Sequence, residues 1–209
     1  MKNKKILIIA LILIIVIVGG VIIKIQIPKI QLNKSIKYLK NGDYKEAYLY
    51  INEKNNKENK IIIEELISEI FCNRAGAGIK KVEEILQKST AVIQKVDINN
   101  IDYTLDDDIN IYTEALDTYI NLENEISRNM IAEELRECYD SYFDIMKYTK
   151  ENFFNVLDHI NDDEFINQMS NFSTEMQKDA NDFFSYADNH KFKAKTQDIY
   201  QEIEKYIIK

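Results

Sequence analysis

The sequence predicts an all-α protein with one membrane-spanning helix, and three observations lead to this fold class. The chain of 209 residues contains only five glycines and one proline, a composition that suits long helices better than sheets. An uncharged apolar run fills residues 6–23. Beyond it, apolar residues recur at spacings of three and four, the period of one helix face. The predicted order is an N-terminal transmembrane helix, a helical hairpin region and an antiparallel helical bundle.

Residues 1–28 are predicted to be a short N-terminal tail and a transmembrane signal-anchor. Three lysines precede the apolar run, which is long enough to span a bilayer because about 18 apolar residues suffice. A cleaved signal peptide is the alternative, since the apolar core up to Val18 is short and two glycines follow it. A short basic tail ahead of the first apolar segment favours a cytoplasmic N-terminus, although lysines also flank the other end. The sequence therefore predicts a single-pass bacterial membrane protein with an extracytoplasmic body.

Charge divides the rest of the chain into two halves of opposite sign. Lys24–Lys95 contains 14 Lys/Arg and 9 Asp/Glu, whereas Val96–Lys209 contains 10 and 26. Basic residues beside a membrane segment are attracted to anionic lipid headgroups. The acidic half argues against nucleic acid as a partner, because phosphate neutralisation needs the opposite charge. The expected partners are the membrane and a protein of unknown identity.

Residues 29–96 are predicted to form a basic helical hairpin region. The stretch "LKNGDYKEAYLYI" has Gly42 where one helix ends and Asp43 where the next is capped. With Tyr44 and Ala47, this turn resembles the turn of a tetratricopeptide repeat, which implies that the tyrosine packs between helices and that the alanine lets them approach. Gly78 lies 36 residues after Gly42, but its surroundings lack the other repeat residues. An ordinary α-hairpin without a repeat array therefore stays open.

Residues 97–104 are predicted to be a linker, and residues 105–209 an acidic helical bundle. The segment "VDINNIDYTLDDD" interrupts the helical period, and Thr104 with Asp107 has the spacing of a capping box. Apolar stripes then indicate four amphipathic helices, with a bend or a turn expected at residues 127–129. The longest stripe consists of Ile131, Leu135, Cys138, Tyr142, Ile145, Thr149, Phe153, Val156 and Ile160.

The sequence contains no recognisable catalytic, cofactor-binding or metal-binding motif. His159 and His190 are the only histidines, and neither belongs to a zinc-protease or di-iron pattern. Walker, G-x-S-x-G and G-x-G-x-x-G motifs are absent. The acidic segment from Asp97 to Asp108 lacks the glycine of a calcium-binding EF-hand loop. We therefore expect a protein that is not an enzyme and that needs no cofactor or metal.

Two groups of residues are candidates for partner binding. Tyrosines of the hairpin could line a groove or fill its core, and carboxylates opposite the long stripe could bind a basic partner or simply face water. The candidates are Tyr44, Tyr48, Tyr50, Glu133, Glu137, Asp140 and Asp144. Cys72 and Cys138 fit either reduced core residues or a disulfide outside the cytoplasm.

These features predict a non-enzymatic, membrane-anchored helical interaction or scaffold protein. The alternative is a ligand-sensing extracytoplasmic helical domain that acts through a partner membrane protein.

Overall fold

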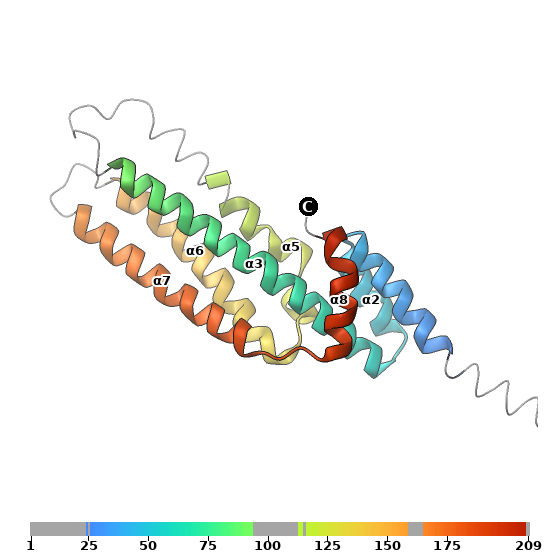
Figure 1. Cartoon of the computed structure of the whole chain (residues 1–209). Coiled ribbons are helices and arrows are strands. Elements are labelled where there is room, and N and C mark those ends of the chain that lie inside the picture. Colours follow the sequence, from blue (N-terminus) through green and yellow to red (C-terminus); the bar gives the residue numbers. More distant parts are fainter. Residues whose placement is uncertain (1–23, 25, 94–112, 115, 159–164, 208–209) are drawn as a thin grey trace, which may run out of the picture. The chain divides into compact units, whose positions relative to one another are not determined.

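Helices joined by short turns and extended segments make up the computed structural model, which describes residues 24, 26–93, 113, 114, 116–158 and 165–207 (Figure 1). The predicted all-α class is confirmed, and no strand occurs among these residues. Residues 24 and 26–40 are also helical, as are residues 113, 114 and 116–120. The other elements are α2 (Tyr44–Glu53), α3 (Lys57–Ile93), α5 (Leu122–Glu125), η2 (Arg128–Met130), η3 (Glu133–Leu135), α6 (Arg136–Asp158), α7 (Phe165–Asn189) and α8 (Ala194–Ile207), with η marking a 3₁₀ turn.

Within the described residues, no helix combines the length and the apolar character needed to cross a membrane. Almost all of the predicted anchor, residues 1–28, lies outside the described part, so the anchor stays a prediction.

The chain divides into two compact units. The first unit comprises Met1–Ile63 with Ile203–Lys209, and the second unit comprises Glu64–Glu202. Most of α3 belongs to the second unit, and the predicted domain ranges 29–96 and 105–209 stay a prediction. α3 has 37 residues, whereas α2 has only 10. Because α2 is too short to cover the whole apolar face of α3, the rest of that face needs another element to pack against. The predicted linker, residues 97–104, lies outside the described residues.

In the first unit, the turn between the first helix and α2 is built around Gly42. Its φ of +80° lies in the left-handed region, where glycine carries no Cβ penalty. The amide of Gly42 donates to the Leu39 carbonyl at 3.0 Å, which closes the first helix. Asp43 occupies the N-cap of α2, but its side chain makes no capping hydrogen bond, contrary to the prediction. Three side chains of α2 are buried, namely Tyr44, Ala47 and Ile51.

The second unit has an aromatic core between α3, α6 and α7, which run side by side (Figure 1). The ring centroid of Phe71 on α3 lies 4.9 Å from Tyr139 and 5.5 Å from Tyr142, both on α6. Tyr142 in turn lies 6.0 Å from Phe183 on α7. Rings at these separations in tilted or edge-on contact add stability beyond their buried area.

The structure confirms the predicted long stripe as core over the residues whose burial it describes. These are Ile131, Leu135, Cys138, Tyr142, Ile145 and Thr149, all buried. They do not share one helix, however. Ile131 is extended and Leu135 ends η3, while α6 begins only at Arg136. Phe153 and Val156 are helical without described side-chain surroundings, and Ile160 lies outside the described residues.

The small residues in the middle of α3 make room for aromatic rings, and not for the backbone of another helix. α3 runs without a break through Ala75 to Gly78. A Cβ placed on Gly76 would lie 3.3 Å from the Phe184 ring, and one on Gly78 would lie 2.8 Å from the Tyr119 ring. The close neighbours of these two glycines are therefore side chains.

Candidate functional site

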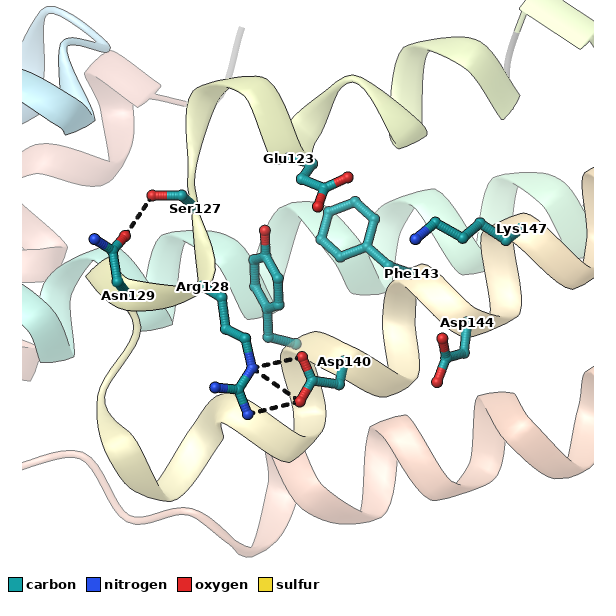
Figure 2. A pocket seen from close by; sticks show the side chains of 9 residues that line it. Glu123, Ser127, Arg128, Asn129, Asp140, Phe143, Asp144 and Lys147 are labelled. Carbon is teal, nitrogen blue, oxygen red and sulfur yellow. Dashed lines mark hydrogen bonds and ion pairs between the residues drawn. The ribbon is translucent and has the colours of Figure 1, made fainter.

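An open groove of about 620 Å³ lies along one face of α6 in the second unit (Figure 2). We call it the α6 groove. Its walls come from α5, the segment around η2, and α6. It is lined by Glu123, Ser127, Arg128, Asn129, Tyr139, Asp140, Phe143, Asp144 and Lys147.

Helical spacing explains why α6 supplies five of these residues. Tyr139, Phe143 and Lys147 are four residues apart, as are Asp140 and Asp144, so both rows follow the same side of the helix. Tyr139 and Phe143 are each only 4% exposed and form the floor. Figure 2 shows the charged ends of Glu123 and Lys147 on either side of the Phe143 ring. The groove therefore combines an aromatic floor with a charged rim.

The second wall exists because the chain leaves the helical conformation after α5. Ile126 is extended, with φ of −125° and ψ of 105°, and its carbonyl accepts a hydrogen bond from the Tyr139 hydroxyl at 3.0 Å. Ser127 is also extended, and its hydroxyl donates to the Asn129 side chain at 2.6 Å. The Tyr139 hydrogen bond holds the non-helical segment against α6, and the Ser127–Asn129 hydrogen bond lies within that segment.

Arg128 and Asp140 form a bidentate ion pair across the groove. The Arg128 Nε donates to Asp140 Oδ1 at 2.7 Å, and Nη2 donates to Oδ2 at 2.8 Å. This hydrogen bonding raises the pKa of Arg128. Both side chains are substantially exposed, at 53% and 44%, and exposed pairs contribute little to stability. The pair therefore serves mainly to set the shape and the charge pattern of the rim.

The floor of the groove is kept uncharged. Burial raises the pKa of Tyr139 to about 12, and the negative charges of Glu123 and Asp140 add to this effect. Its hydroxyl therefore stays protonated at neutral pH and remains a hydrogen-bond donor.

The arrangement offers an aromatic floor and charged rim groups for noncovalent binding. The lining contains no histidine or cysteine. Over the described part of the chain, no group of three or more His, Cys, Asp or Glu side chains converges to hold a metal ion. Charged groups at the rim can instead form ion pairs with a ligand, since Glu123, Asp144 and Lys147 make no ion pair with another described residue.

The structure places the four predicted carboxylates at two kinds of position. Asp140 and Asp144 line the α6 groove. Glu133 in η3 and Glu137 in α6 are exposed but do not line it. The groove brings together only half of the predicted acidic set.

The three predicted tyrosines belong to the first unit. Tyr44 is 4% exposed and is therefore a core residue of the hairpin. Tyr50 is half-buried, and the Nζ atoms of Lys34 and Lys54 lie 4.6 and 5.2 Å from its ring centroid. Tyr48 lies under Lys60 at 5.8 Å. Lysines of the same unit thus cover both rings by cation–π contacts.

Sequence reasoning missed Glu123, Arg128, Tyr139, Phe143 and Lys147. Tyr139 and Phe143 directly follow Cys138 and Tyr142 of the predicted stripe, so their place at its edge could have been read from the same period. Arg128 gives no comparable signal, because its approach to Asp140 depends on the non-helical path between α5 and α6.

Comparison with protein-family models, curated proteins and solved structures found no match to this chain.

Proposed function

We propose that this protein is a non-enzymatic, membrane-anchored helical interaction protein whose α6 groove binds a basic segment of a protein partner. The charged rim of this groove carries the proposal. Glu123 and Asp144 offer carboxylates to Lys or Arg side chains of a partner, and the Tyr139–Phe143 floor offers the aromatic surface that hot spots favour.

The charge of the second unit supports a basic partner. Its sequence, Glu64–Glu202, contains 13 Lys/Arg and 30 Asp/Glu, a net charge of −17. A field of this sign attracts a basic partner and accelerates its association.

A labelled Lys-rich peptide tests the groove by fluorescence anisotropy. We expect Glu123→Lys and Asp144→Lys to weaken its binding by at least about tenfold each, because each replaces an attraction by a repulsion. Asp182→Lys is the matched control, since Asp182 is exposed on α7 outside the groove. Equal losses in all three variants would mean that only the overall charge of the unit attracts the peptide.

The membrane anchor is supported by the sequence of residues 6–23, and protease treatment of intact cells tests the topology. A C-terminal tag should be removed from intact cells if the body is extracytoplasmic. Protection of the tag until the cells are lysed would place the body in the cytoplasm. A reproducible hydrolase or transferase activity of the purified chain would overturn the non-enzymatic assignment.

The volume of the groove also bears on the alternative, a ligand-sensing domain. About 620 Å³ lies within the usual range of small-molecule sites, but such sites are enclosed and predominantly apolar. The α6 groove is open and has a charged rim, which favours an extended peptide. Thermal stabilisation of the chain by a small molecule, lost in the Asp144→Lys variant, would instead support the sensing function.

A further inference from the structure

Two lysines of the first unit converge on one aromatic ring. The Nζ atoms of Lys34 and Lys54 lie 4.6 and 5.2 Å from the ring centroid of Tyr50. The ring of Tyr38 lies 6.1 Å from that of Tyr50. We call these four residues the Tyr50 cluster. Two of them belong to the helix of residues 26–40, and the other two belong to α2 and its C-cap.

The two ammonium groups of the Tyr50 cluster are held in place but are not neutralised. Both lysines are exposed, and neither forms an ion pair with a carboxylate in the described part of the chain. An ammonium group has three donors, so a cation–π contact leaves donors for an oxygen anion. The cluster therefore offers two positive charges at one ring to a negatively charged ligand.

Exposed apolar side chains continue this surface along the helix of residues 26–40. Ile27, Ile30 and Lys34 follow one another at spacings of three and four, so they share one side of that helix. Ile30 is 61% exposed. Among the described residues, five of the six exposed large hydrophobic side chains belong to the first unit, namely Ile27, Ile30, Leu49, Ile61 and Tyr206. Apolar residues beside lysines and tyrosines are typical of surfaces at a bilayer boundary.

We propose that the Tyr50 cluster, with Ile27 and Ile30, binds the headgroup region of anionic phospholipids. Residues 24–63 contain nine Lys and four Asp/Glu, a net charge of +5 that complements such a surface. Ile30 follows the apolar run of residues 6–23 by seven positions, which span at most about 25 Å. The inference rests on the membrane anchor of the proposed function and is independent of the α6 groove.

The charged and the apolar residues act on different parts of the lipid. The ammonium groups of Lys34 and Lys54 bind phosphate oxygens, while Ile27 and Ile30 enter the boundary between headgroups and acyl chains. Phosphatidylcholine has no net charge, whereas phosphatidylglycerol carries one negative charge. We therefore expect the contact to depend on the anionic lipid and to weaken as salt is added.

The test is acylation of the full chain in nanodiscs, with each lysine followed by peptide mass spectrometry. The nanodiscs contain either phosphatidylcholine alone or an equimolar mixture with phosphatidylglycerol. Only the neutral amine is acylated, and a nearby phosphate stabilises the ammonium form. At low salt we expect Lys34 and Lys54 to react about fivefold more slowly in the mixed nanodiscs, the factor that corresponds to the attraction of one lysine to an anionic surface. Unchanged rates for both lysines, or equal slowing of every lysine, would overturn the proposal.

Two matched charge reversals test the cluster itself. Lys34→Glu and Lys45→Glu change the net charge of the first unit equally, and both lysines are exposed. Lys45 lies five positions from Tyr50 and therefore on a different side of α2. Lys34→Glu should remove most of the lipid-dependent slowing of Lys54, whereas Lys45→Glu should preserve it. Equal losses in the two variants would mean that only the net charge attracts the lipid, which contradicts a defined site.

Two further measurements on the unmodified chain examine other ligands for this surface. Inorganic phosphate is added to the phosphatidylcholine nanodiscs, and the chain is also acylated at increasing concentration in neutral detergent. We expect no slowing of Lys34 and Lys54 in either case. Slowing by inorganic phosphate would assign the cluster to the free anion, and slowing that grows with protein concentration would assign it to a second copy of the chain. Either result would overturn the proposal.

The membrane anchor has its own readout in these samples. Co-migration of the chain with phosphatidylcholine nanodiscs in size-exclusion chromatography reports the anchor. Retention on both kinds of nanodisc without slower acylation would overturn the lipid-binding surface alone. Retention only on the mixed nanodiscs, with slower acylation of Lys34 and Lys54, would contradict the anchor and support the lipid-binding surface.

Discussion

At the scale of single residues, aromatic side chains of the second unit leave no room for a side chain at Gly78. An added Cβ would lie 2.8 Å from Cδ1 of Tyr119 and 3.1 Å from the hydroxyl oxygen of Tyr142. Alanine is a better helix former by roughly 1 kcal/mol, but overpacking a core costs ~1–3 kcal/mol. We therefore expect Gly78→Ala to lower the free energy of unfolding by about 1 kcal/mol in a urea titration.

A Tyr119→Ala background is the control for this prediction. Without the Tyr119 ring, the added methyl group loses its closest neighbour, so Gly78→Ala should become neutral or stabilising. An equal loss of stability in both backgrounds would mean that the Tyr119 contact is not the cause.

Tyr139 makes the stability of the second unit sensitive to alkaline pH. Its pKa is raised from the ordinary 10.0 to about 12, chiefly by burial and then by Glu123 and Asp140. The fold thus favours the neutral phenol, and this contribution is complete below pH 10 and is lost as the pH rises from about 10 towards 12.

The Tyr139→Phe variant isolates this effect. At pH 8 we expect a loss of about 1–3 kcal/mol, because the Ile126 carbonyl loses its donor. Between pH 9 and pH 11 the variant should lose less stability than the original chain, since phenylalanine does not titrate. Urea midpoints of both proteins at pH 9 and pH 11 measure this difference in stability. If the two proteins lost the same stability over this range, ionisation of Tyr139 would not be the cause. Tyr142 is unchanged in both proteins, so its own raised pKa cancels in the comparison.

At the scale of elements, the beginning of α8 is tied to α3 through a buried carboxylate. The Thr196 hydroxyl donates to Glu65 Oε2 at 2.5 Å, and the Lys193 ammonium lies 2.7 Å from Oε1. Thr196→Val removes one hydrogen bond to a charged acceptor, which costs about 1.5–3 kcal/mol. We expect the amides of the first turns of α8 to exchange faster with deuterium while those of α6 change less.

Thr174→Val provides the matched control for α8. The Thr174 hydroxyl is exposed and donates to the Ser170 carbonyl of its own helix at 2.8 Å. Its loss should leave exchange in α8 unchanged. Similar effects of the two substitutions would show that the Glu65 contact does not secure α8.

Helical periodicity predicted burial better than it predicted backbone conformation. Ile131 and Leu135 fit the stripe and are buried, yet they precede α6, because an extended residue and a 3₁₀ turn can orient side chains towards the same core. The α6 groove was only half predicted. Asp140 and Asp144 follow from helix spacing, whereas Arg128 reaches Asp140 through a non-helical path that has no periodic signal.

At the scale of the whole molecule, the compact units separate charge more strongly than the two halves of the sequence do. The first unit contains 14 Lys/Arg and 5 Asp/Glu, a net charge of +9, against −17 for the second unit. Asp179 illustrates the crowding locally. Burial raises its pKa, Lys178 lowers it, and the like charges of Glu175, Asp182 and Asp144 raise it. Such self-repulsion opposes the compact state.

Salt should therefore stabilise the second unit. Raising NaCl from about 0.05 to about 0.5 M shortens the screening length severalfold, and we expect slower deuterium exchange in α6 and α7. Near pH 4, where about half of ordinary carboxylates are protonated, the effect should shrink. If salt instead accelerated exchange, attraction within ion pairs such as Lys150–Asp117, at 2.7 Å, would outweigh the repulsion among the carboxylates. The sign of the salt effect thus decides whether the excess of carboxylates destabilises the fold of the second unit.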